Sequence, residues 1–258
     1  MCSFATISLS AAIMYFYRLG TDTHLGKNMP HSLRKVVLVV LMGLVAPLAG
    51  AFSLDDLSNR DADSGLKAAL ERGSSEAVGK LAQDGGFLNN GKVHIPLPKV
   101  LEQARPILKM TGHGQQLDEL EVAMNRAAES AVPLARPLLL KAVKSMTITD
   151  AKNILTGGET SVTTFFKEKT AEPLAQQFLP IVKGVTDRSG LAGKYNRVVG
   201  QVGKLANVPP EQATVEGYVT QRTLDGLFYM IGEEEKAIRQ DPLGTGSKII
   251  GKVFGLLK

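Results

Sequence analysis

The sequence has little of the chemistry that cysteine and aromatic residues supply. It contains one cysteine, Cys2, and no tryptophan, and aromatic residues make up 5% of its 258 residues. A single cysteine cannot form an intrachain disulfide or a multi-thiolate metal site. With few aromatic rings, the chain also has little material for stacking on bases or sugars. These absences argue against thiol chemistry, thiolate metal sites and aromatic stacking platforms.

Sequence signatures of nucleotide and hydrolase sites are also missing. No Gly-Lys pair is followed by Ser or Thr, no Gly-x-Ser-x-Gly elbow occurs, and Gly244-Thr245-Gly246 lacks the third glycine of a dinucleotide fingerprint. Beyond residue 51 the histidines are His94 and His113, which fall in different elements. Glycines flank His113, so we expect it on a surface loop. We therefore predict no cofactor and no metal.

The charge is distributed in a way that does not favour nucleic acid binding. The formal net charge is +5, and residues 1–51 hold four basic residues against one acidic residue. The rest of the chain is close to neutral, and its lysines and arginines are spread among carboxylates. Because no basic stripe forms, we expect no nucleic-acid partner.

Residues 29–51 have the three parts of a secretory signal peptide. Arg34 and Lys35 precede an apolar run over 36–45, and Ala49-Gly50-Ala51 forms a small-x-small cleavage site. The run is shorter than the roughly 20 residues that span a membrane. We therefore expect a periplasmic protein that begins at Phe52, and no lipidation, because no cysteine stands at the cleavage point. The alternative is a buried helix or a retained membrane anchor.

Residues 1–28 do not fit this prediction directly, because a signal peptide normally starts a chain. One explanation is that translation begins at Met29 rather than Met1, which makes 1–28 a mis-annotated extension. The alternative is that the apolar residues 9–17 belong to a longer hydrophobic anchor. N-terminal sequencing of protein from its native host distinguishes the two.

Helical periodicity runs through most of the remaining chain, so we predict that 52–258 is a single all-α, multi-helix domain. Pro96 and Pro98 keep 93–97 extended, with a minor hairpin near Val93 as an option. A linker is expected at 207–210, and Pro173 and Pro180 suggest a kinked helix. The expected helices start near 64, 97, 115, 133, 149, 160, 191, 218 and 247.

Two helix starts have specific expectations. Asp63 or Ser64 is expected to cap the first helix, and Thr149-Asp150 is expected to cap the short helix that ends at Gly157-Gly158. Asn59, Asp61 and Asp63 imitate the start of a calcium loop. The match fails further on, where Ser64 replaces the glycine and Leu70 replaces the glutamate. We therefore favour capping over calcium binding.

The stretch 218–242 is predicted to organise the domain. Its apolar residues recur at three- and four-residue steps, which defines one helix face: Leu224, Leu227, Phe228, Ile231 and Ile238. Glu235 falls on this face, with Glu234 beside it. A carboxylate placed there needs a partner. Arg239, four residues later, is a local one, and Arg126 or Arg222 could come from elsewhere in the fold.

The cluster of Glu234, Glu235, Arg239 and Arg126 has two interpretations. It could perform acid-base work as the candidate catalytic site of a hydrolase-like enzyme, because burial raises a carboxylate pKa towards working pH. It could instead form a buried structural ion-pair network, which we favour. We expect Asn125, Arg126 and Glu129 to bridge between closely packed helices.

Two further stretches have a binding and a structural interpretation. The break at Gly157-Gly158, followed by Thr160 and Ser161, could hold an anion at a helix start, or simply join two caps. The segment 247–258 is basic and amphipathic, with Lys248, Lys252 and Phe254 available for a membrane surface. The same pattern describes a last helix that docks on the core, which the two glycines Gly251 and Gly255 favour.

Several blocks together carry a family resemblance. They are SGLKAAL (64–70), FLNNGKVHIPLP (87–98), MNRAAESAVP (124–133), ILTGGETSVTTFF (154–166) and DGLFYMIGEEEKAIRQDP (225–242). In these blocks the chain resembles the bacterial domain of unknown function family 4197 (DUF4197). The resemblance implies an exported helical protein and supplies no activity or site residues.

The leading functional hypothesis is a non-enzymatic envelope protein that binds a protein partner or an apolar ligand in a groove between helices. One alternative is the hydrolase-like enzyme that uses the Glu/Arg cluster. The other is a membrane-surface protein that binds through its C-terminal segment.

Overall fold

The computed structural model describes residues 59–188, 190–202, 213–242 and 244. The chain divides into two units, Met1–Ala51 and Phe52–Lys258, and the described residues all belong to the second. The predicted signal peptide, the predicted linker at 207–210 and the amphipathic segment at 247–258 lie outside the described residues. The described structure is therefore that of the helical unit alone.

The described residues are helical and contain no strand, which confirms the all-α prediction. The elements in chain order are α3 (Asn59–Ala82), α4 (Lys99–Met110), α5 (Gly114–Ala131), the short 3-10 helix η3 (Val132–Leu134), α6 (Ala135–Lys144), α7 (Ile148–Thr156), α8 (Ser161–Thr186), α9 (Gly190–Val202) and α10 (Val215–Gln240).

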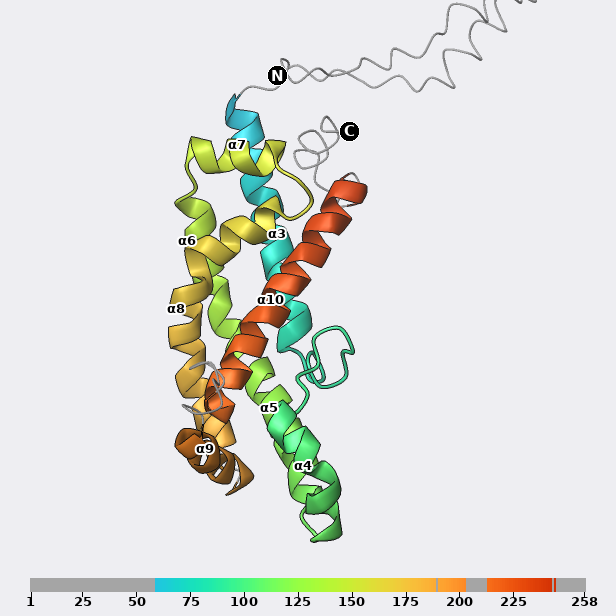
Figure 1. Ribbon diagram of the computed structural model, residues 1–258. Coiled ribbons are helices and arrows are strands. Elements are labelled where there is room, and N and C mark those ends of the chain that lie inside the picture. Colours follow the sequence, from blue (N-terminus) through green and yellow to red (C-terminus); the bar gives the residue numbers. More distant parts are fainter. Residues whose placement is uncertain (1–58, 189, 203–212, 243, 245–258) are drawn as a thin grey trace, which may run out of the picture. The chain divides into compact units, whose positions relative to one another are not determined.

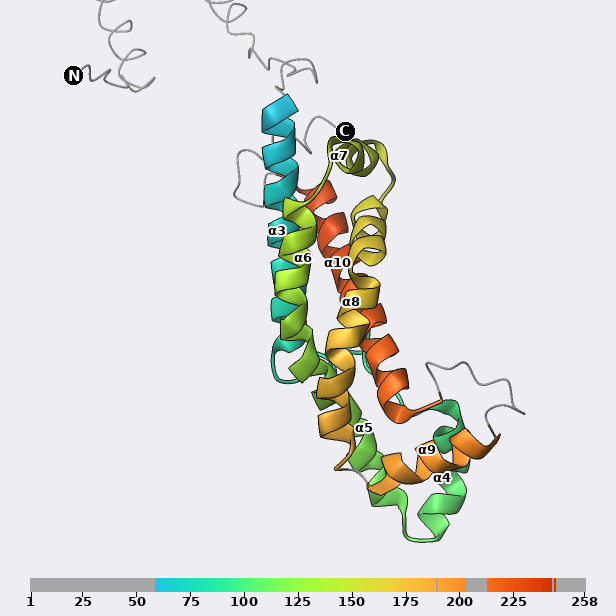
Figure 2. The same ribbon diagram turned by 90° about the vertical axis from the view of Figure 1, so that its left-hand side faces the viewer.

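Two long helices, α8 and α10, form the centre of the packing (Figure 1). α10 packs against α8, α3 and α5, as its apolar stripe predicted. α8 packs in addition against α6 and α7, so it shares the organising role that the sequence assigned to 218–242 alone. The view in Figure 2 shows α8 lying alongside both α10 and α5.

The core is built from the helix faces that the periodicity predicted. Residues at three- and four-residue steps are buried in each long helix: Leu66, Leu70, Ala77 and Leu81 in α3; Leu117, Leu120, Met124, Ala127, Ala128 and Ala131 in α5; Val162, Phe165 and Phe166 in α8. Each fully buried leucine or phenylalanine contributes roughly 1.5–3 kcal/mol of transfer free energy. Tertiary burial of these faces therefore stabilises the helices.

Several helix boundaries differ from the predictions. α3 begins at Asn59, so Asp63 and Ser64 lie inside the helix and cap nothing. Its helical backbone over 59–63 also differs from a calcium loop, which contradicts that interpretation. The helix expected to contain Pro173 and Pro180 is α8, which continues through both prolines because its buried face outweighs the hydrogen bonds that they remove.

The segment 83–98, between α3 and α4, is a loop that side chains of α5 hold in place, and it forms no hairpin. Gly85 has a φ of 81°, which a residue with a Cβ rarely adopts. Ile95 donates its N–H to Asn125 Oδ1 over 2.9 Å, and its carbonyl accepts from Asn125 Nδ2 over 2.9 Å. The Asn125 amide therefore takes the place of a neighbouring strand. The expectation that Asn125 and Glu129 bridge helices is wrong, because both side chains bind this loop.

The cap of α7 is Thr147, two residues before the predicted Thr149. The Thr147 Oγ1 accepts the N–H of Asp150 over 3.1 Å, and the Asp150 carboxylate accepts the N–H of Thr147 over 3.0 Å. This reciprocal pair is a capping box, and it satisfies two donors that a helix start leaves free. It fixes the point at which α7 begins.

Replacing Thr147 with alanine is expected to lower the free energy of unfolding by about 1 kcal/mol, because the Asp150 N–H loses its acceptor. Urea unfolding followed by far-UV circular dichroism measures the change. Thr149→Ala is the matched control, since Thr149 is exposed and its side chain has no hydrogen bond to any described residue. Equal losses in the two variants would contradict the assignment of the cap.

The effect of the same variant should depend on pH. The backbone N–H and the hydroxyl of Thr147 hold the pKa of Asp150 below its ordinary value of 3.8. A lowered carboxylate pKa contributes stability above the ordinary value, and this stability is lost as the pH falls through the lowered value. The difference between wild type and Thr147→Ala should therefore be full at neutral pH and should shrink as the pH falls below the ordinary Asp150 value of 3.8.

Candidate functional site

The Glu235 carboxylate lies buried where α10 crosses the start of α8. Its Oε1 accepts the N–H of Val162 and its Oε2 accepts the N–H of Thr163, each over 3.1 Å. The Thr163 hydroxyl donates to Oε2 over 3.1 Å as well. The residue is 4% exposed. The carboxylate is therefore the anion that caps the N-terminus of α8, where free N–H groups and the helix dipole favour negative charge.

Arg239 completes this site and joins α7 to α8 and α10. Its Nε and Nη2 donate to Glu235 Oε1 over 3.2 and 3.1 Å. The same Nη2 donates to the Ile154 carbonyl over 3.1 Å and to Ser161 Oγ over 2.7 Å. The end of α7, the beginning of α8 and the last turns of α10 are thus held together by one ion pair.

Two candidates from the sequence therefore turn out to be one feature. The helix start after Gly157-Gly158, for which an anion site was one of two interpretations, does hold an anion, and this anion is the Glu235 carboxylate of the same chain. The cavity beside it is about 20 Å³, which is room for about one water molecule. A general base must reach a substrate proton, and a carboxylate enclosed in this way has donors on both oxygens already. The geometry favours the structural interpretation of Glu235 and Arg239.

The other candidate residues lie elsewhere. Glu234 pairs with Lys80 of α3 on the surface of the helical unit. Arg126 binds Glu129 and Asp84, and Glu129 in turn accepts the N–H of Phe87 over 3.0 Å. Arg126 therefore belongs to the anchorage of the 83–98 loop. The structure does not bring Arg126 together with Glu235.

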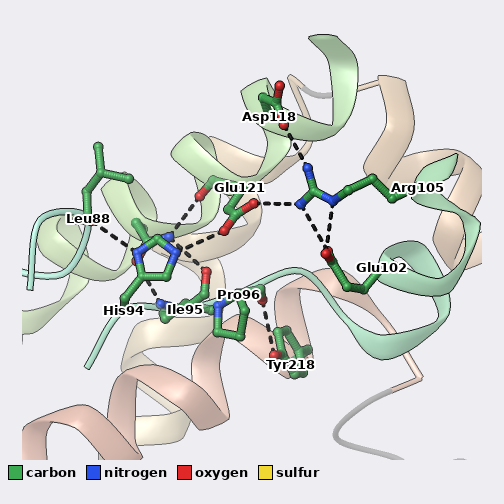
Figure 3. A network of polar contacts seen from close by, with 10 residues as sticks. Leu88, His94, Ile95, Pro96, Glu102, Arg105, Asp118, Glu121 and Tyr218 are labelled. Atoms are coloured by element: carbon green, nitrogen blue, oxygen red, sulfur yellow. Dashed lines mark hydrogen bonds and ion pairs between the residues drawn. The ribbon is translucent and has the colours of Figure 1, made fainter. Parts of the chain in front are cut away.

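A second polar network lies around Arg105 and was not predicted from the sequence (Figure 3). Arg105 of α4 donates to Glu102 over 2.9 Å, to Asp118 over 2.8 Å and to Glu121 over 3.0 Å. These carboxylates, Glu102 above all, raise the pKa of Arg105. The local signal was the three-residue spacing of Glu102 and Arg105, but the partners on α5 depend on tertiary structure.

The same network holds His94, which connects it to the loop. His94 Nε2 lies 2.9 Å from Glu121 Oε1 and Nδ1 lies 3.0 Å from the Leu88 carbonyl (Figure 3). Both ring nitrogens face acceptors, so a doubly protonated ring donates to both and a neutral ring to only one. Neither nitrogen is left to take a proton from a substrate. The arrangement fixes α4 and the loop on α5, and it lacks a nucleophile.

An open groove of about 400 Å³ runs between α8 and α10. Its lining includes Thr160 and Thr163 from the start of α8 and Phe228, Tyr229 and Gly232 from α10. A Cβ on Gly232 would lie 3.2 Å from Thr163 Oγ1, which is closer than an ordinary van der Waals contact. The absence of a side chain at Gly232 therefore lets the two helices approach closely at the base of the groove.

Charged side chains surround the apolar part of the groove. Lys92 pairs with Glu233, which lowers the pKa of Glu233, and its Nζ lies 5.9 Å from the centre of the Tyr229 ring. Lys167 of α8 also lines the groove and forms no ion pair with any residue that the structure describes. The groove thus combines an aromatic surface with a free cation on its edge.

Other classes of site are not seen in the described residues. Within 59–188, 190–202, 213–242 and 244, no group of three or more His, Cys, Asp or Glu side chains could hold a metal ion. No helix in those ranges is long and apolar enough to cross a membrane.

Comparison with known proteins identifies a family and nothing beyond it. Residues 56–255 match the family model described as Protein of unknown function (DUF4197), as the sequence blocks indicated. No curated protein and no solved structure matches the chain. None of these comparisons supplies an activity, so any functional conclusion has to come from the site itself.

Proposed function

The chain belongs to the family described as Protein of unknown function (DUF4197), and from this premise we propose that it is an exported, non-enzymatic binding protein. Its site is the groove between α8 and α10. The ligand has an apolar body that lies against Phe228 and Tyr229 and a polar end that meets the charged edge. A small amphipathic molecule or a short segment of a protein partner has this chemistry.

The observation that carries the proposal is the exposed aromatic surface in the groove. Tyr229 is 44% exposed although it stands beside the buried Phe228 on α10, which packs against α8, α3 and α5. The exposed surface of the groove is mainly apolar although charged side chains such as Lys167 and Glu233 stand among its lining, and small-molecule sites combine apolar surface with polar groups in this way. The groove volume of about 400 Å³ also falls within the range of roughly 300–1,000 Å³ that such sites have.

Binding is better supported than hydrolysis. An enzyme of the hydrolase-like class would need a carboxylate that reaches solvent in a pocket. Glu235 is enclosed and saturated with donors, and Glu234 pairs with Lys80. The arginine closest to the carboxylate, Arg239, bonds to Ile154, Ser161 and Glu235 itself. Glu234, Glu235 and Arg239 therefore make contacts that hold helices together.

In this proposal the protein is exported, so the groove lies in the periplasm. The support is the pattern of residues 29–51, which has the basic, apolar and small-residue parts of a signal peptide. A direct role of Lys248, Lys252 and Phe254 at a membrane stays a prediction, since these residues lie outside the described part of the chain.

Native mass spectrometry of the protein, purified gently from the periplasm of its host, tests the binding role. We expect a mass above that of the processed chain, and we expect Tyr229→Ala to lose most of this excess because the ligand loses its aromatic contact. Leu179→Ala is the matched control, since Leu179 is a similarly exposed residue of α8 that does not line the groove. A wild-type protein without added mass, or equal added mass in all three proteins, would contradict the proposal.

A further inference from the structure

Helix α4 carries an apolar face that nothing in the described structure covers. Met110 is 88% exposed and Ile107 is 67% exposed, and Val100 is also exposed. Successive helical residues are rotated by about 100°, so positions 100, 107 and 110 fall on one side of the helix. Leu101 is buried on another side, where α4 packs against α5. α4 therefore has two apolar sides: one packs against α5, and the other is exposed.

The charges around this exposed face are positive. Lys99 and Lys109 stand at the two ends of α4, and neither forms an ion pair with a described residue. The acidic residue of α4, Glu102, lies away from this face and is bound by Arg105. The nearest carboxylates of α5, Asp118 and Glu121, are bound by the same guanidinium. By the same rotation Lys99 lies beside the exposed face, whereas Lys109 and Glu102 both lie further round the helix, so the face has a free cation at one edge and no carboxylate of α4 on it.

The size of the face argues against a second copy of the chain as its partner. A helix of 12 residues is about 18 Å long and about 10 Å wide, so it covers roughly 200 Å² on each partner. Specific protein interfaces bury at least about 1,200 Å² in total. A lipid surface has no such requirement, because a single helix can lie in the interface with its apolar side chains among the acyl chains.

We propose that α4 is a membrane-contact helix that lies on an anionic lipid surface. Val100, Ile107 and Met110 enter the interface, while Lys99 beside them meets the lipid phosphates. Arg105 holds α4 on α5 through Asp118 and Glu121, so the face is presented by a fixed helix. Both views show α4 beside the first half of α5, at the end of the helical unit away from α7 (Figures 1 and 2). This contact uses a different element from the α8/α10 groove and stands independently of it.

Co-sedimentation of the full chain with vesicles tests the contact. Vesicles of equal parts phosphatidylglycerol and phosphatidylcholine should bind the protein at low salt, and vesicles of phosphatidylcholine alone should bind it much less. Ile107→Asp and Met110→Asp should each weaken binding roughly tenfold, because a carboxylate replaces an inserted apolar group. Both side chains are exposed, so neither substitution should disturb the fold, and far-UV circular dichroism checks this.

The controls separate α4 from other surfaces of the protein that could bind vesicles. Ile148 of α7 is 78% exposed, so Ile148→Asp introduces the same charge at a similarly exposed position and should leave vesicle binding unchanged. Absence of wild-type binding, or equal loss with Ile148→Asp, would overturn the proposal. Loss on deletion of 247–258 with full binding by Ile107→Asp would assign the contact to the C-terminal segment instead. A wild-type dimer in light scattering that Ile107→Asp converts to a monomer would assign the face to a second copy.

Discussion

Replacing Glu235 with alanine is expected to lower the free energy of unfolding by about 3–5 kcal/mol. The substitution removes the carboxylate that pairs with the largely buried guanidinium of Arg239. It also removes the acceptor of the buried Val162 N–H and of the partly buried Thr163 N–H. Breaking a buried ion pair and leaving donors unsatisfied each cost far more than a surface ion pair contributes.

Urea unfolding followed by far-UV circular dichroism measures this loss. The chain offers an internal control, because Glu233 and Glu234 immediately precede Glu235 on the same helix. Glu233→Ala removes a surface pair with Lys92 and should cost much less than Glu235→Ala, because exposed ion pairs contribute little. If Glu235→Ala costs no more than Glu233→Ala, the carboxylate does not hold α8 to α10 as described.

A double-mutant cycle with Arg239→Ala tells whether the pair acts as a unit. Removing Arg239 leaves the Glu235 carboxylate its donors from α8, among them the N–H groups of Val162 and Thr163, so the single loss should be smaller than that of Glu235→Ala. Removing both should cost less than the sum of the two single losses, since each single variant already removes the interaction between the two side chains. Additive losses would mean that the two side chains stabilise the protein separately.

The sequence predicted the part of the Glu235 site that lies within α10. The period of α10 placed Glu235 among buried residues, and the four-residue step placed Arg239 beside it. The other half could not be read from the sequence, because Val162 and Thr163 meet Glu235 only through the packing of α8 on α10. Helix faces are local patterns, whereas the partner of a helix terminus depends on the whole fold.

The wrong predictions also concern contacts between parts of the chain that are far apart in the sequence. The extended segment at 93–97 suggested a hairpin, but the Asn125 side chain supplies the hydrogen bonds that a second strand would have given Ile95. The His94 and Arg105 network joins a loop to two helices and leaves little trace in any one of them. The cap of α7 is different, since the spacing of Thr147 and Asp150 is that of a capping box and could have been recognised.

Gly226 is the second position where a small change should have a large effect. Replacing it with alanine is expected to lower the free energy of unfolding by about 1–3 kcal/mol, although alanine is the better helix former. A Cβ at this position would lie 2.7 Å from Phe87 Cε1 and 3.3 Å from Val93 Cβ. The Phe87 ring is fully buried, and the backbone N–H of Phe87 donates to Glu129. The 83–98 loop therefore cannot simply move aside.

Gly184→Ala in α8 is the matched control, since a Cβ there meets no atom within 4 Å. It should raise the free energy of unfolding by about 0.5–1 kcal/mol through helix propensity alone. Opposite signs for the two substitutions in urea unfolding would show that contact with the 83–98 loop decides the outcome at Gly226. The variant Phe87→Leu combined with Gly226→Ala should recover part of the loss, because a smaller side chain makes room for the methyl group. If Gly226→Ala is as stabilising as Gly184→Ala, the loop does not pack against α10 in the way that the Phe87 contact requires.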